Sequence, residues 1–112
     1  MALKHVVCRT DVAGEDKRNI TRYVSSFDPG RPDDFSQRDF ETVLAASNGG
    51  YALREFLADR KFEPRIQYVD NPRDARLFDH GEGLLSATSF LRYISLCSRD
   101  SDGLRVDSVR ID

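Results

Sequence analysis

The chain has 112 residues, of which 39% are hydrophobic and 32% are charged, and its formal net charge is −2. This length suits one hydrophobic core and is too short for two, so we expect a single globular domain over residues 1–112. The mixed and nearly neutral charge argues against binding of polyanions, and no apolar run approaches the length that spans a bilayer.

The first part of the chain predicts a strand, a helix and a loop. Residues 3–10 contain an apolar run at positions 6–8, which is typical of a central strand that is buried on both faces. Residues 13–27 carry apolar side chains at spacings of three and four, so they predict an amphipathic helix. These side chains are Ile20, Tyr23, Val24 and Phe27. Two prolines and a glycine within residues 28–35 end this helix, and we expect a mobile loop there.

The middle of the chain predicts two short helices joined by a glycine turn. Ser36 is a suitable N-cap, and Asp39 places negative charge in the first turn, so a helix should begin at Gln37. Residues 47–50, with the sequence Ser-Asn-Gly-Gly, tolerate the left-handed conformation that closes a helix. A further helix is expected at about residues 51–61.

The next segment predicts a strand and then becomes ambiguous. Residues 62–68 alternate between apolar and polar side chains, which indicates a half-buried strand, and Pro64 places it at an edge or at a strand start. Residues 73–83 favour no single structure, although Leu77 and Phe78 are expected to anchor the core between two turns.

The end of the chain leaves a choice between helix and strand. Residues 86–98 fit a helical spacing, whereas their content of aromatic and β-branched residues suits a strand, and we favour the helix slightly. A turn then leads into a final strand at residues 104–111. Together these elements predict an α+β fold in which three to four helices pack on a small, mostly antiparallel sheet.

The histidines and cysteines do not form a metal site by their spacing. His5 and Cys8 should point to opposite faces of a strand, and His80 and Cys97 lie 17 positions apart, so we expect neither a metal nor another cofactor. Two distant cysteines are expected to be free thiols in a reducing compartment. The first residues show no signal peptide or membrane anchor, and we expect a cytoplasmic protein.

The two middle helices allow a DNA-binding hypothesis. Residues 37–61 have about the lengths of a helix-turn-helix pair, which would present basic side chains of the second helix to the major groove. These side chains are Arg54, Arg60 and Lys61. Glu55 and Asp59 on the same helix argue against this hypothesis, and a helical hairpin packed on a sheet explains the same spacing. Nucleic acid is therefore an alternative partner that we do not favour.

The remaining features favour a protein that acts by contact. Aromatic and arginine side chains dominate the energetics of protein interfaces. The candidate partner-binding residues are Tyr51, Arg54, Arg65, Tyr68 and Arg76. We therefore expect a non-enzymatic regulator or inhibitor, of the kind that phage and other mobile elements direct against a host complex, with another protein as partner and a homodimer allowed. A third hypothesis is a small enzyme that uses His80 with the neighbouring carboxylates of Asp79 and Glu82.

Overall fold

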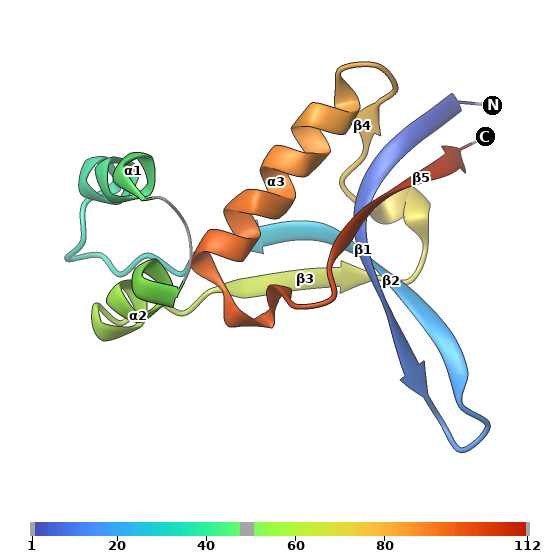
Figure 1. The fold of residues 1–112 in the computed structure, drawn as a ribbon, viewed down its shortest axis with the longest axis horizontal. Helices are drawn as coiled ribbons and strands as arrows, with labels where there is room; N and C mark the ends of the chain where they lie inside the picture. Colours follow the sequence, from blue (N-terminus) through green and yellow to red (C-terminus); the bar gives the residue numbers. More distant parts are fainter. Residues whose placement is uncertain (1, 48–50, 112) are drawn as a thin grey trace.

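The computed structural model of the protein describes residues 2–47 and 51–111, and in this part of the chain it confirms the α+β prediction (Figure 1). The elements follow one another as β1 (Ala2–Ala13), β2 (Arg18–Asp28), α1 (Gln37–Ala46), α2 (Tyr51–Asp59), β3 (Arg65–Val69), the 3-10 turn η1 (Pro72–Asp74), β4 (Phe78–Asp79), α3 (Gly83–Cys97), the 3-10 turn η2 (Arg99–Ser101) and β5 (Arg105–Ile111). None of the helices in these residues has the length and apolar content that crossing a membrane requires.

β1 is the central strand of the sheet, as its apolar run predicts. Its first seven residues pair with β5, its last six pair with β2, and Lys4 and His5 pair with the short strand β4 on the side opposite β5. β2 continues past β1 and pairs with β3 at the other end of the sheet. All of these pairings are antiparallel.

The predicted helix at residues 13–27 is wrong, because most of this segment forms β2. Residues 14–17 make a tight turn that returns the chain along β1. The helix-like spacing of Val24 and Phe27 has a local cause: the register between β2 and β3 shifts between Val24 and Ser26. This bulge adds one residue, so side chains three positions apart reach the same face of the sheet. Both therefore pack into the sheet core.

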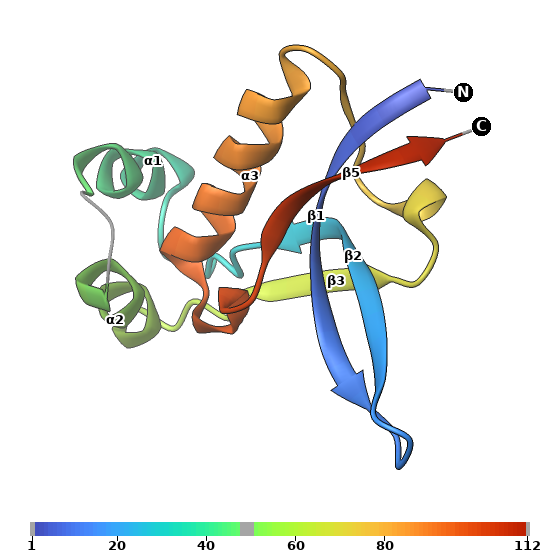
Figure 2. The ribbon, with the colours of Figure 1, turned by 45° about the vertical axis from the view of Figure 1, so that its right-hand side comes forward.

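Two apolar clusters hold the molecule together, and α3 contributes to both. Where α3 covers the sheet, the buried centre consists of Val7, Val24 and Ile94. Where the second half of α3 meets α1 and α2, the buried centre consists of Phe40, Leu53, Leu57, Phe62 and Cys97. Figures 1 and 2 show α1 and α2 beside α3 and away from the sheet, whereas η1 lies on the opposite side of β1 from α3.

The remaining helix predictions are confirmed. α1 begins at Gln37, where the Ser36 side chain accepts a hydrogen bond from the Asp39 amide at 3.0 Å. α2 occupies most of residues 51–61, and the favoured helix at residues 86–98 corresponds to α3. Residues 48–50 of the predicted glycine turn lie outside the described residues.

The strand predictions for the second half of the chain are also confirmed. β3 begins directly after Pro64 and, among the strands of residues 2–47 and 51–111, pairs only with β2. β5 forms at the predicted end of the chain. Leu77 and Phe78 are half-buried, and the Phe78 ring contacts Phe90 of α3.

The predicted loop at residues 28–35 is the long connection between β2 and α1. Gly30 in this loop has φ +71°, and its carbonyl oxygen accepts a hydrogen bond from the Glu63 amide. A Cβ atom at Gly30 would lie 2.0 Å from the Glu63 carbonyl oxygen, so this position needs glycine both for its conformation and for its space. The loop is thus packed against the segment that precedes β3, and its mobility stays a prediction.

Candidate functional site

The hairpin of β1 and β2 extends beyond the rest of the sheet as a two-stranded arm, which we define as residues 9–22. β5 pairs with β1 no further than Cys8, and β3 pairs with β2 only from Tyr23 onward. Within the described residues, no further strand therefore lies along either edge of the arm. Figures 1 and 2 both show the arm projecting away from the helices.

The turn at the tip of the arm follows from its local sequence. Gly14 adopts φ +83° and Lys17 adopts φ 54°, and the Lys17 amide donates a hydrogen bond to the Gly14 carbonyl oxygen at 3.2 Å. Glu15 and Asp16 occupy the two exposed positions between them. The left-handed conformation at Gly14 is one that glycine adopts without steric cost.

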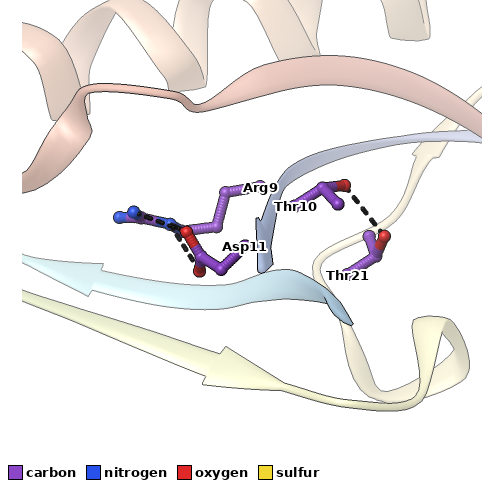
Figure 3. A network of polar contacts seen from close by, with 4 residues as sticks. All are labelled: Arg9, Thr10, Asp11 and Thr21. Carbon is purple, nitrogen blue, oxygen red and sulfur yellow. Dashed lines mark hydrogen bonds and ion pairs between the residues drawn. The ribbon is translucent and has the colours of Figure 1, made fainter. Parts of the chain in front are cut away.

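One face of the arm is uncharged. Cross-strand partners share a face, and the pairs Thr10 with Thr21 and Val12 with Asn19 place four neutral side chains together. The two threonine hydroxyls lie 2.9 Å apart and form a hydrogen bond (Figure 3), and Arg105 donates to the Thr10 hydroxyl at 2.9 Å. Val12 is 65% exposed. This face therefore offers solvent-exposed β-branched side chains on an uncovered ribbon.

The other face of the arm is charged at its base. The Arg9 guanidinium donates hydrogen bonds of 2.9 to 3.2 Å to the Asp11 carboxylate (Figure 3). The bonds to Asp11, followed by the nearby Tyr68 hydroxyl, raise the pKa of Arg9, which stays a cation. The Tyr68 hydroxyl is buried, and no partner in the described residues reaches it with ordinary hydrogen-bond geometry. Ile20, which is 37% exposed, lies directly opposite Asp11 on β2.

The predicted partner-binding residues do not form one surface. Arg54 donates from Nε to the Ser95 carbonyl oxygen of α3 at 2.7 Å, on the side of α3 where the helices pack. Tyr68 pairs with Val24, whose carbonyl oxygen accepts a hydrogen bond from the Arg76 amide, so these two lie near one another. Arg65 lies opposite Asp28 and is exposed. The side chain of Tyr51 lies outside the described part of the structure.

The three basic residues of the DNA-binding hypothesis lie on α2 and directly after its end. Arg54 is held on α3, whereas the Arg60 guanidinium lies over the Phe56 ring at 4.6 Å. Lys61 adopts φ 66° after the end of α2, where its amide donates to the Ala58 carbonyl oxygen. The guanidinium groups of Arg54 and Arg60 thus pack against neighbouring residues, and the backbone of Lys61 ends α2.

The surroundings of His80 contain an open hollow of about 550 Å³. Asp79, Glu82 and Ser86 line it together with His80, but the Asp79 carboxylate forms an ion pair with Lys4. The His80 ring stacks on His5, with 5.8 Å between the ring centroids. The structure therefore brings the two histidines together, which their sequence positions did not indicate.

The two cysteines are buried, free thiols. Burial raises the pKa of Cys97 to about 12 and also raises the pKa of Cys8, although the nearby Arg105 opposes the shift at Cys8. In the described residues, no three histidine, cysteine or acidic side chains converge as metal ligands would.

Sequence reasoning missed the arm altogether. A hairpin signal is present in residues 13–17, Ala-Gly-Glu-Asp-Lys, between two stretches that contain β-branched residues.

Comparison of the chain with protein-family models, curated proteins and solved structures finds no match.

Proposed function

We propose that this protein is a non-enzymatic protein-binding module and that the arm is the element that contacts its partner. The observation that carries the proposal is that the two strands of the arm extend past the last residues that pair with β5 and β3. Neither of these strands therefore covers the edges of the arm. An isolated pair of strands is only marginally stable in water, and unpaired strand edges readily accept another strand. A partner that adds an extended segment to the arm would satisfy the outward-facing amide and carbonyl groups.

The side chains of the arm suit a polypeptide better than a polyanion. Its uncharged face presents Val12 and two threonines, which pack well against another β-strand. Basic and acidic groups nearly balance on the arm as a whole. The basic residues are Arg9, Lys17, Arg18 and Arg22, and the acidic residues are Asp11, Glu15 and Asp16. Since ion pairs already engage Arg9 and Arg18, little positive charge is left for counterion release.

The arm can be removed without touching the core, which allows a direct test. In a short-arm variant, residues 11–20 are replaced by Asn-Gly, a dipeptide that favours a tight hairpin turn next to the Thr10–Thr21 pair. The matched control is Leu85→Lys, which adds a charge at a side chain of α3 that is 74% exposed. Wild type, control and short-arm variant are immobilised and incubated with nuclease-treated extract of the native cells.

We expect wild type and the Leu85→Lys control to retain a common protein that the short-arm variant does not retain. A photoreactive residue in place of Val12 should cross-link to that same protein. Equal retention by all three proteins contradicts the proposal. Arm-dependent retention that is seen only in a parallel experiment with untreated extract would instead assign the arm to nucleic acid. A regulatory or inhibitory role would follow if the bound partner changes its activity when the arm is present.

A further inference from the structure

The two edges of the arm differ in what lies beside them. On the β1 edge, the Arg105 guanidinium of β5 donates a hydrogen bond to the Thr10 hydroxyl. On the β2 edge, β3 ends at Val69, which lies opposite Tyr23. Within the described residues, no side chain of β2 residues 18–22 forms a hydrogen bond or ion pair with a residue outside the arm. The β2 edge is therefore the more open of the two.

The base of the β2 edge carries an arginine whose charge is not paired. Arg22 lies opposite Arg9 on the face of the arm that also carries Asp11, and like charges in directly opposite positions repel one another. The Asp11 carboxylate accepts its hydrogen bonds from Arg9. No carboxylate in the described part of the chain lies within ion-pair distance of the exposed Arg22. Together these three groups leave one positive charge in excess.

The end of β3 limits where another strand can pair with the β2 edge. Asp70 follows Val69 in a bend that leads toward η1, so an added strand can pair with β2 only from about Thr21 toward the tip. On this strand, the residue opposite Ile20 would share the charged face of the arm. It would be a diagonal neighbour of Arg22, at a separation of about 7–8 Å that long side chains span. An acidic side chain at that position could therefore reach Arg22.

We propose that the partner adds an antiparallel strand to the β2 edge of the arm and that a carboxylate of this strand, at the position opposite Ile20, binds Arg22. The pairings described for this sheet are antiparallel. Main-chain hydrogen bonds along the edge supply affinity, and the side chain that faces Arg22 supplies specificity, because a guanidinium binds a carboxylate through two parallel hydrogen bonds. This inference rests on the proposed function of the arm and names the chemistry of its partner, which is an extended segment with an acidic side chain.

Selection from a library of displayed random peptides tests this chemistry before the natural partner is identified. Wild type and the short-arm variant are immobilised at about 0.15 M salt, and the peptides that only wild type retains are sequenced. We expect these arm-dependent peptides to share an acidic residue at one position. The peptides that both proteins retain serve as the background for this comparison.

A neutral form of one selected peptide measures the contact with Arg22. The acidic residue of the peptide is replaced by the amide of the same length, and fluorescence anisotropy gives the Kd of both forms. The amide form should bind wild type about tenfold more weakly, since it loses a charge-assisted hydrogen bond. In Arg22→Gln the two forms should bind equally within about twofold. In the matched control Arg18→Gln the tenfold difference should persist, because Asp16 already pairs with Arg18.

Two results would overturn this inference and leave the proposed function intact. They are arm-dependent peptides without a shared acidic residue, and a tenfold difference that persists in Arg22→Gln. Hydrogen exchange with and without the peptide locates the added strand: residues 18–22 should gain more protection than residues 9–13, and the reverse would contradict the inference by placing the strand on the β1 edge. If wild type and the short-arm variant retain the same peptides, the proposed function itself fails and this inference fails with it.

Discussion

β1 passes through two different environments along its length. At residues 6–8 every side chain is buried, with β5 on one edge and α3 over one face. At residues 10–12 the strand leaves β5, and Thr10 and Val12 are exposed. Secondary structure is the same in both halves, so the difference lies entirely in what covers the strand. The first half supplies stability, and we assign the second half to binding because its edges and one uncharged face are open.

Thiol reactivity should show the largest contrast between the two halves. We expect a Val12→Cys thiol to react with a disulfide reagent at pH 8 at least about 1,000-fold faster than Cys97, and also faster than the buried Cys8, whose pKa is raised. An exposed thiol is partly ionised at this pH, whereas a thiol with a pKa of about 12, as at Cys97, has a thiolate fraction of about 10⁻⁴. A thiol reagent with an optical readout measures the number and rate of the reacting groups. A fast phase in wild type would contradict the burial of the native cysteines.

The same substitution in both halves should differ strongly in its effect on the free energy of unfolding. Val7→Ala removes buried methyl groups from the sheet core and should cost about 2 kcal/mol. Val12→Ala should change the stability by less than about 0.5 kcal/mol. Urea denaturation measures both values. Equal losses would mean that the arm is packed, which would remove the basis for assigning it to a partner.

Some elements of this fold could be predicted from local sequence signals, and β2, which forms one strand of the arm, could not. Local signals were sufficient for α1, whose cap is formed by neighbouring residues. They favoured α3 only slightly, because its aromatic and β-branched residues also suit a strand. They failed in β2, because the bulge after Val24 gives a strand the spacing of a helix. Strand pairing could have decided between the two, but pairing depends on residues distant in the chain.

The grouping of the candidate binding residues likewise depends on contacts between residues that are distant in the chain. Composition identified aromatic and arginine side chains but could not determine which of them share a surface. Tyr68 and Arg76 come together through Val24, a contact across more than 40 residues that depends on the register of β2 and β3. Arg54 is held on the opposite part of α3 by a hydrogen bond to a carbonyl oxygen that no sequence pattern indicates.

A double-mutant cycle can measure how much the contact between the two strands of the arm contributes to the free energy of unfolding. Thr10→Ala, Thr21→Ala and the double variant should give a coupling energy of about 0.5 kcal/mol, as expected for a cross-strand hydroxyl pair on an exposed ribbon. Urea denaturation of all four proteins supplies the values. A coupling near zero would mean that the two hydroxyls do not hold the strands together in solution, and a partner would then have to order the arm.

The smallest effect is expected at the beginning of β1, at the end remote from the arm, where Lys4 forms an ion pair with Asp79 of β4. The ion pair lowers the pKa of Asp79 below its ordinary value, so the carboxylate stabilises the folded state above that value and the contribution disappears as the pH falls through the lowered pKa. Asp79→Asn should therefore lower Tm slightly at pH 7, and the difference from wild type should vanish toward pH 2. Because Asp79 is exposed, 0.5 M salt should weaken the effect at neutral pH. Thermal unfolding of both proteins across this range measures it, and a difference that stays constant from pH 7 to pH 2 would show that the amide substitution acts on something other than the carboxylate charge.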